Sequence, residues 1–319
     1  MTLFFAAEHT RANGAIKEPS EGGSMVATLS VEATLAWFYS IIRYTRERPG
    51  AAMPRIETDD GTEVFVRDMG SGDPIVFVHG WPLNHRMFEY QYEALLDAGH
   101  RCLGVDLRGY GQSDKPYGEY SYDRFADDLR AVIDALDVEG ATLAGFSMGG
   151  GTVTHYMSRH DEAGVEKLAL LGAASPCLTE KPDFSEGLSD EEIDPLVEGA
   201  RNDRPAMNAQ FGEMLFHQMP SEEFLDWLWS LAMQASQYAT ATSAETFRDE
   251  DLRSDMADIT VPTKICHGVN DEICPFDITA EVLHEGIDDA ELVRFEDSGH
   301  GLFYEERGKL TDELLDLTR

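Results

Sequence analysis

The stretch Gly145-Phe146-Ser147-Met148-Gly149 reads Gly-x-Ser-x-Gly and is the most informative part of this chain. It follows an apolar run, 141–146, that is typical of a β-strand, and it opens a run, 148–159, that is typical of a helix. A serine on such a sharp turn adopts strained backbone angles, and side chains two residues away on either side would collide with the turn. Glycine at both positions removes these collisions. The motif therefore predicts a serine whose hydroxyl stands clear of a sheet edge as a nucleophile.

Strand-like and helix-like segments alternate from residue 55 onward. Asp59-Asp60-Gly61 predicts a β-hairpin, and continuous apolar runs such as 75–78 are expected of parallel strands that are buried on both faces. Strands that alternate with helices require right-handed crossovers, so we predict an α/β fold with a doubly wound, mostly parallel sheet. The expected strands are 55–57, 63–68, 75–78, 101–105, 142–146, 165–171, 264–267 and 291–295, and the expected helices are 87–98, 122–136, 148–159, 278–283 and 304–317.

One interval, between the sixth strand and the strand at 264–267, has helical periodicity and little strand character. An insertion after the sixth strand lies at the carboxyl edge of the sheet, where ligands bind, and would act as a lid. Apolar residues from Phe224 to Tyr238 recur at spacings of three and four and predict one amphipathic helix. We expect Trp227 from this stripe to contact substrate, and packing against the core is the alternative. The predicted domains are a core, 53–173 and 250–319, and a helical cap, 174–249.

The chain is strongly acidic. Its 319 residues include 60 Asp and Glu against 25 Lys and Arg, which gives a formal net charge of −35. A field of this sign repels nucleic acid and anionic membranes, so we expect neither as a partner. The acidic residues are interleaved with apolar segments, which argues against disorder. We interpret the surface as that of a halophilic, cytoplasmic protein, and an ordinary acidic enzyme is the alternative.

The four cysteines, at 102, 177, 266 and 274, do not have the spacing of metal ligands. Cys102 and Cys266 lie in apolar strand-like runs, where cysteine acts as a small buried hydrophobic residue. We therefore expect no metal site, and we interpret the chain as a reduced, intracellular protein.

The first 52 residues differ from the rest of the chain. The apolar run 33–42 is about half the length that spans a bilayer. Its arginines, including Arg43 and Arg46, follow the apolar run, whereas a secretory signal has them first. We interpret residues 1–52 as an N-terminal extension without assigned function, with Met53 as an alternative start.

A nucleophilic serine needs a base that takes its proton and an acid that orients this base. His300 lies in Ser298-Gly299-His300-Gly301 directly after the last predicted strand, where glycines let the loop approach the serine. We predict His300 as the base. Asp271 follows the strand 264–267 at the same sheet edge and is the expected acid. Asp297 competes for this role, but it is close to His300 in sequence and is interpreted as loop support.

Two backbone N–H groups are needed to stabilise the negative oxygen that forms when the serine attacks. Met148, at the start of the helix 148–159, is one expected donor, because the helix dipole adds positive potential there. The second is expected from His79-Gly80-Trp81-Pro82, after the strand 75–78, with Trp81 as the donor. Pro82 has no N–H and a fixed φ. We expect Pro82 to act at the substrate, and the alternative is that it only shapes the turn.

Together these motifs resemble the α/β-hydrolase superfamily, and within it the cofactor-free bacterial haloperoxidases and aryl esterases. The resemblance spans residues 55 to about 318. It implies an α/β-hydrolase fold with a catalytic triad of Ser147, Asp271 and His300 and an oxyanion hole at Trp81 and Met148. The motifs that carry it are His-Gly-Trp-Pro at 79–82, Asp-Leu-Arg-Gly-Tyr-Gly-Gln-Ser at 106–113, Gly-Phe-Ser-Met-Gly-Gly-Gly at 145–151, His-Gly-x-x-Asp at 267–271 and Gly-His at 299–300.

The resemblance also implies an activity on small or aryl esters. Enzymes of this kind form an acyl-enzyme, which water converts to a carboxylic acid and hydrogen peroxide converts to a peracid that oxidises halide. It implies a small-molecule ester as the substrate, and neither haem nor metal as a cofactor. Proline at position 82 resembles the perhydrolase branch. Assembly into a homo-oligomer stays open.

Two other functions fit the same sequence. Carbon–carbon bond hydrolases keep a serine nucleophile, and some ligand receptors on this fold retain an intact triad. Ser147 argues against dehalogenases and epoxide hydrolases, which use an aspartate nucleophile. A fold-level resemblance does not fix the chemistry. Turnover of a small activated ester would separate an enzyme from a receptor.

Overall fold

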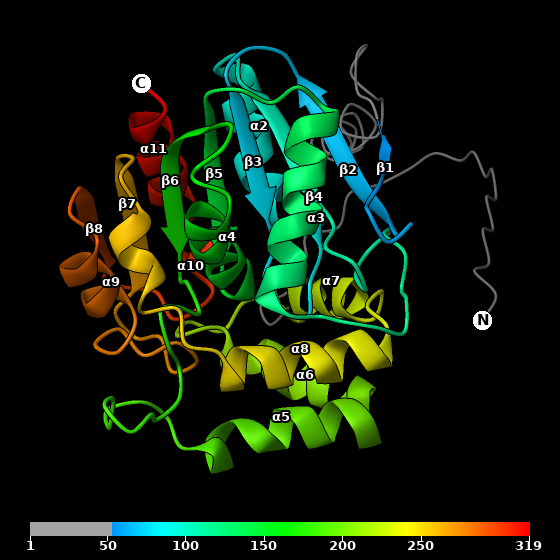
Figure 1. Ribbon diagram of the computed structural model, residues 1–319. Helices are drawn as coiled ribbons and strands as arrows, with labels where there is room; N and C mark the ends of the chain where they lie inside the picture. Colours follow the sequence, from blue (N-terminus) through cyan, green and yellow to red (C-terminus); the bar gives the residue numbers. More distant parts are fainter. Residues whose placement is uncertain (1–52) are drawn as a thin grey trace, which may run out of the picture. The chain divides into compact units, whose positions relative to one another are not determined.

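The computed structural model describes residues 53–319, and the interpretations of residues 1–52 lie outside the described residues. Its centre is an eight-stranded sheet with the order β1-β2-β4-β3-β5-β6-β7-β8 (Figure 1). β2 pairs antiparallel with β1 and β4, and all other neighbours are parallel. The strands are β1 (Arg55–Glu57), β2 (Glu63–Gly70), β3 (Pro74–Val78), β4 (Arg101–Val105), β5 (Ala141–Phe146), β6 (Val165–Leu171), β7 (Thr263–Gly268) and β8 (Ala290–Phe295).

The continuous apolar runs form the centre of the sheet. Every residue of β5 is buried, and so are all but the first residue of β3. Helices cover both faces of this sheet and supply the second and third layers of the core. The doubly wound, mostly parallel sheet that the sequence predicts is therefore confirmed.

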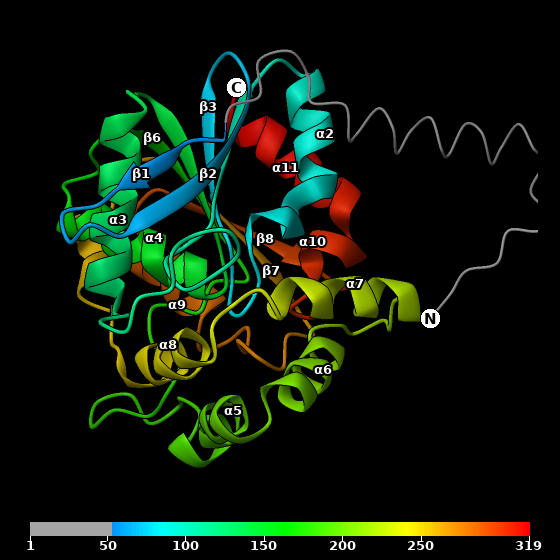
Figure 2. The same cartoon turned by 90° about the vertical axis from the view of Figure 1, so that its right-hand side faces the viewer.

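The covering helices divide between the two faces. α2 and α11 lie side by side on one face, and α3 and α4 lie side by side on the other (Figure 2). These elements are η1 (His85–Phe88), α2 (Glu89–Asp97), α3 (Tyr122–Ala135), α4 (Met148–Arg159), η2 (Asp255–Asp258), α9 (Ala280–Gly286), α10 (Leu302–Glu305) and α11 (Arg307–Leu317).

The interval between β6 and β7 is helical, which confirms the cap that the sequence predicts after the sixth strand. Its helices lie beyond the strand ends to which the arrows of β3 and β6 point, that is, at the carboxyl edge of the sheet (Figure 1). α5 packs against α8 and α6, and α6 packs against α7. The helices are α5 (Asp190–Asn202), α6 (Arg204–Met214), α7 (Glu222–Ala232) and α8 (Gln237–Asp249).

The prediction of one amphipathic helix from Phe224 to Tyr238 is wrong. The chain forms two helices here, α7 and α8, with a turn between them. Ser236 causes this break: its hydroxyl accepts the N–H of Ala239 at 3.0 Å and caps a new helix. Its own N–H donates to the carbonyl of Gly109, at 2.9 Å, on the loop after β4. The cap is therefore tied to the core at this turn. Smaller differences are that 278–283 is α9 at Ala280–Gly286 and that 304–317 divides into α10 and α11.

Candidate active site

Ser147 lies at the junction of β5 and α4 in a backbone conformation that residues other than glycine rarely adopt. Its φ is 54° and its ψ is −121°. A Cβ atom at Gly149 would lie 2.6 Å from the carbonyl oxygen of His79, and one at Gly145 would lie 2.6 Å from the side chain of Val153. Glycine at both positions is therefore required by close approach. This is the sharp strand-to-helix turn that the Gly-x-Ser-x-Gly pattern predicts.

The first turn of α4 continues as Gly149-Gly150-Gly151. These glycines let the helix pack closely: a Cβ atom at Gly150 would lie 2.7 Å from the Cα of Ala173, and one at Gly151 would lie 2.5 Å from the ring of Tyr122. Ser147 is held on both sides of this turn, because its N–H donates to the carbonyl of Leu171 and its carbonyl accepts the N–H of Ala174. The backbone of Ser147 is therefore anchored on both sides of the turn.

His300 and Asp271 meet at the carboxyl edge of the sheet, beside this turn. Nδ1 of His300 lies 2.7 Å from Oδ2 of Asp271, and both side chains are almost completely buried. The ring of His300 packs on Phe146, the residue before Ser147, with 4.8 Å between the ring centroids. Nε2 of His300 is buried and has no hydrogen-bond partner among residues 53–319. A proton on Nδ1 is bonded to the carboxylate, which leaves Nε2 as an acceptor.

Asp271 is stabilised as an anion. Its Oδ1 accepts the backbone N–H groups of Ile273 and Cys274, at 2.9 and 2.8 Å. Burial would raise the pKa of Asp271, but the charge of His300 and hydrogen bonds from His267 and His300 hold it well below the usual range. The carboxylate can therefore orient the imidazole and stabilise its cation.

The competing residue, Asp297, contacts other partners through its backbone. Its N–H donates to Glu306 at 3.2 Å, and its carbonyl accepts the side chain of Gln218 at 3.2 Å. The loop therefore uses the backbone of Asp297, while the side chain of Asp271 meets His300.

The residues predicted as oxyanion donors flank Ser147. Met148 begins α4 and is buried. The loop after β3 approaches from the other side, since a Cβ atom at Gly80 would lie 2.8 Å from the Cβ of Ser147. The indole of Trp81 in this loop donates to the carbonyl of Thr240 on α8, at 2.8 Å. Pro82 follows through a cis peptide bond and is buried.

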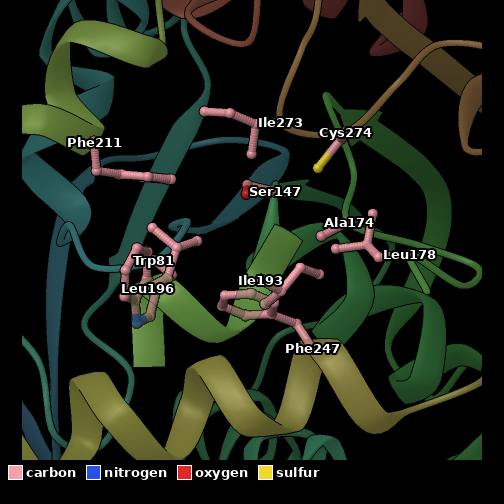
Figure 3. Close-up of a pocket in the computed structure, with 10 residues that line it drawn as sticks. All are labelled: Trp81, Ser147, Ala174, Leu178, Ile193, Leu196, Phe211, Phe247, Ile273 and Cys274. Carbon is pink, nitrogen blue, oxygen red and sulfur yellow. The ribbon is translucent and has the colours of Figure 1, made fainter. Parts of the chain in front are cut away.

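A small apolar cavity of about 40 Å³ opens onto Ser147 (Figure 3). Helices of the cap supply a large part of its wall, and the loop after β7 places Cys274 beside the serine. Burial raises the pKa of the Cys274 thiol well above its usual value, so the thiol stays neutral. The lining residues are Trp81, Ser147, Ala174, Leu178, Ile193, Leu196, Phe211, Phe247, Ile273 and Cys274.

Pro82 and Trp227 are placed apart from this lining. Trp227 is half-buried on α7, where its ring lies 5.2 Å from that of Phe224. The aromatic contacts to the cavity come instead from Phe211 on α6 and Phe247 on α8, which pack against Trp81 at 4.8 and 5.7 Å. The sequence analysis missed both phenylalanines, because a helix residue that faces a cavity has the same spacing as one that faces the core.

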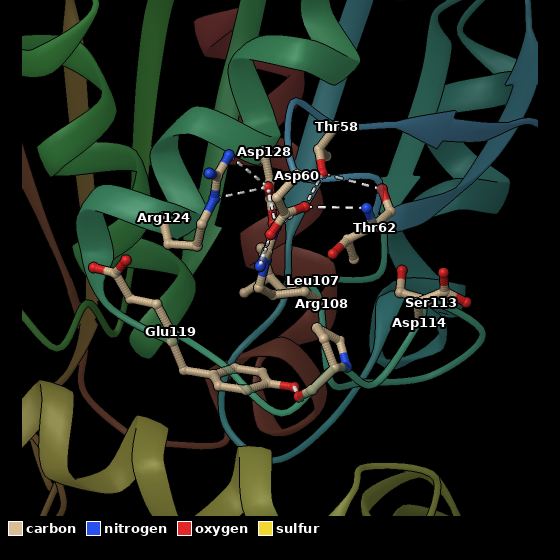
Figure 4. A network of polar contacts seen from close by, with 12 residues as sticks. Thr58, Asp60, Thr62, Leu107, Arg108, Ser113, Asp114, Glu119, Arg124 and Asp128 are labelled. Carbon is tan, nitrogen blue, oxygen red and sulfur yellow. Dashed lines mark hydrogen bonds and ion pairs between the residues drawn. The ribbon is translucent and has the colours of Figure 1, made fainter.

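The loop after β4 fixes the loop that carries Trp81. The N–H of Leu107 donates to Nε2 of His79 at 3.1 Å, directly before the Gly80-Trp81 segment. Arg108 holds this loop with paired hydrogen bonds to Asp128 on α3 and to Asp60 in the β1–β2 hairpin (Figure 4). Both Arg108 and Asp128 are buried, and such bidentate pairs are geometrically specific. The loop that carries Trp81 is therefore braced through the loop after β4.

The described residues contain neither a metal-binding cluster nor a membrane-spanning helix. Within residues 53–319, no group of three or more His, Cys, Asp and Glu side chains is arranged to hold a metal ion. Over the same residues, no helix combines the length and the apolar character needed to cross a bilayer.

Comparison with known proteins identifies the class. The family model for the alpha/beta hydrolase fold matches residues 73–307. The chain therefore belongs to the α/β-hydrolase family, as the motifs around Ser147 and His300 predict.

Individual relatives within the family are similar over most of their length. The chain is 50% identical over 255 residues to the AB hydrolase superfamily protein YisY of Bacillus subtilis, covering 80% of this chain and 95% of the relative. It is 34% identical to the non-heme chloroperoxidase CPO-A1 of Kitasatospora aureofaciens, covering 78% and 93%. An esterase structure from Exiguobacterium antarcticum is similar with a TM-score of 0.81 at 45% identity, covering 83% and 98%. The predicted resemblance to haloperoxidases and esterases is thus confirmed.

Proposed function

We propose that this protein is a serine carboxylester hydrolase that works through an acyl-enzyme. The observation that carries the proposal is a strained Ser147 next to a buried His300–Asp271 pair whose outer nitrogen is free of partners within the described residues. The similarity to an esterase at 45% identity supports the same reaction.

The proposed catalytic steps use groups that lie around this turn. The Ser147 hydroxyl attacks the ester carbonyl carbon while Nε2 of His300 takes its proton, and Asp271 stabilises the imidazolium. The backbone N–H groups of Trp81 and Met148 bind the oxygen that becomes negative, and losing one such donor costs roughly 3 kcal/mol of the barrier. His300 then returns the proton to the leaving alcohol. Water repeats these steps on the acyl group and releases the acid.

The cavity supports a preference for short acyl groups. Its volume is about 40 Å³. The wall is apolar apart from Ser147 and Cys274. We propose that acetyl and propionyl esters fit, with the alcohol part toward the cap. The cap helices α5 to α8 would then act as the lid, and the interval 174–249 as a separate structural unit.

We also propose perhydrolysis as a side activity, which the similarity to a non-heme chloroperoxidase supports. Water and hydrogen peroxide attack the same acyl-Ser147, so the product ratio reports groups near the attacking oxygen. Pro82 restricts the residue before it, and the Trp81 carbonyl would accept a hydrogen bond from the terminal hydroxyl of peroxide. Such a bond is worth about 0.5–1.5 kcal/mol, or roughly three- to tenfold in the ratio. Pro82→Leu should lower this ratio while ester cleavage survives. An unchanged ratio, or the loss of both activities together, means that Pro82 only shapes the turn.

One assay tests the proposed function. A panel of p-nitrophenyl esters of increasing acyl length is measured in molar potassium chloride, with and without peroxide and acetate. We expect acetate and propionate esters to react fastest, and Ser147→Ala to abolish their cleavage without unfolding the protein. Absence of turnover for every ester would indicate a receptor. A serine-dependent reaction only on vinylogous diketones would indicate a carbon–carbon bond hydrolase.

The net charge supports a proposal about the salt concentration in which the protein works. Sixty acidic against 25 basic residues is the composition that stays soluble and folded in concentrated salt. We propose that the protein is halophilic and acts in a salt-rich cytoplasm.

A further inference from the structure

A second histidine contacts the carboxylate of Asp271. His267, at the end of β7, is completely buried, and its Nε2 lies 3.1 Å from Oδ2 of Asp271. The same nitrogen lies 2.8 Å from the carbonyl oxygen of Cys274. Both neighbours are acceptors, so Nε2 must carry a proton that it shares between them.

The other ring nitrogen of His267 shows which tautomer is present. Nδ1 is buried and has no hydrogen-bond partner in the part of the chain that the structure describes. A second proton there would be a buried donor without an acceptor, which is unfavourable. The edge-on ring of Phe276, 5.7 Å away, holds the imidazole in place. His267 is therefore held with Nε2 between the carbonyl oxygen of Cys274 and Oδ2 of Asp271.

Four donors consequently surround one carboxylate. Oδ1 of Asp271 receives the N–H groups of Ile273 and Cys274, and Oδ2 lies between His300 and His267. The bond from His300 alone would let the carboxylate rotate about its own axis or accept the proton of the imidazolium. With every lone pair in the plane engaged, both changes become unfavourable.

We propose that His267 is a positioning residue of the triad, which locks Asp271 as an oriented anion so that the proton taken from Ser147 stays on His300 until the alcohol leaves. The proposal rests on the proposed function. It concerns only the third member of the triad, because His267 acts through Oδ2 of Asp271, the oxygen that His300 also contacts. No bond is made or broken at His267 in this role.

A matched pair of amide variants tests the proposal. In His267→Gln the amide nitrogen is the same number of bonds from the backbone as Nε2, so it can still donate to Asp271. In His267→Asn the amide nitrogen takes the place of Nδ1 and points away. We expect His267→Asn to lower kcat for p-nitrophenyl acetate about tenfold with KM nearly unchanged, and His267→Gln to retain about a third or more of kcat.

A spectroscopic measurement separates positioning from general destabilisation. The proton shared by His300 and Asp271 should give a downfield ¹H resonance, which we expect to shift or broaden in His267→Asn and to persist in His267→Gln. Equal kcat in the two variants, or an unchanged resonance in His267→Asn, overturns the proposal. If His267→Asn does not fold, His267→Gln decides alone, because loss of its activity or its resonance contradicts the proposal. Ester cleavage by Ser147→Ala would instead contradict the proposed function.

Discussion

The pair His300–Asp271 and the pair His155–Asp255 have the same contact distance and different environments. In each, Nδ1 of the imidazole lies 2.7 Å from a carboxylate oxygen. The first pair is 1% and 0% exposed, and the second is 18% and 12% exposed. The decisive difference is the second nitrogen. Nε2 of His155 is bonded to Asp123 at 2.6 Å, whereas Nε2 of His300 has no partner within residues 53–319.

The comparison shows that a short His–Asp contact does not by itself indicate catalysis. His155 lies between two carboxylates and joins α4, α3 and η2. Burial lowers the pKa of His155, but the hydrogen bonds to Asp255 and Asp123 more than offset this and raise it. An imidazole saturated in this way braces the fold. An imidazole with one free nitrogen next to a strained serine can accept a proton.

Removing the two imidazoles should give the largest contrast. We expect His300→Ala to lower kcat/KM for p-nitrophenyl acetate by about 10³-fold or more, because members of a triad act as a unit. His155→Ala should leave kcat/KM nearly unchanged. Steady-state kinetics at a temperature where both variants are folded checks this. A comparable loss in both variants would remove the distinction between the pairs.

Neutralising the carboxylates should also distinguish the two pairs, with a smaller loss of activity than removal of the imidazoles. Asp271→Asn keeps the shape of the side chain and removes the anion that stabilises the imidazolium, so we expect a loss of about 10²- to 10⁴-fold in kcat. Asp255→Asn serves as the control in the His155 pair and Asp297→Asn as the control within the loop, and both should stay within about threefold of wild type. If Asp297→Asn is worse than Asp271→Asn, the assignment of the acid is incorrect.

The His155–Asp255 pair should instead affect the stability of the fold and the pH dependence of that stability. A histidine whose pKa is raised by folding stabilises the fold fully below its unfolded pKa, near 6.5, and this contribution disappears as the pH rises through the folded pKa. His155→Gln should therefore lower the thermal midpoint by about 2–4 °C near pH 6 and by much less near pH 9. Calorimetry of both proteins across this range is the measurement. A difference that grows with pH would show that His155 is not a cation in the fold.

Changing the salt concentration should have the smallest of these effects. The Debye length falls from about 10 Å at 0.1 M to about 3 Å at 1 M, which screens the repulsion among surface carboxylates. We expect the thermal midpoint to rise from about 0.1 to about 3 M potassium chloride, while kcat per folded molecule changes little because the His300–Asp271 pair is buried. A flat or falling midpoint would contradict the halophilic hypothesis and leave only an acidic surface.

The sequence predicted the core well, because buried parallel strands leave a direct signal. The apolar run 165–171 coincides with β6, and the helix predicted at 148–159 coincides with α4. The position of Asp271 relative to His300 followed from the rule that carboxyl ends of parallel strands meet at one edge, and the structure places the two side chains 2.7 Å apart.

The helix boundaries of the cap and the contacts around the site could not be predicted with the same accuracy. Ser236 reads as one polar residue in a helical pattern, and only its bond to Gly109 shows that the helix breaks there. The cavity wall depends on how α5, α6 and α8 pack, which is a tertiary property. The contact of His267 with Asp271 was also missed, because a histidine at the end of a buried strand carries no sign of what its ring faces.

The three consecutive glycines that open α4 also determine when the site forms during folding. Glycine is about 1 kcal/mol less favourable than alanine inside a helix, so this turn is weak on its own. It is completed by β3, Ala173 and Tyr122, which come from separate parts of the chain. We therefore expect the turn to become stable only after these parts have assembled. A refolding chain should therefore recover its sheet before it recovers any ester cleavage.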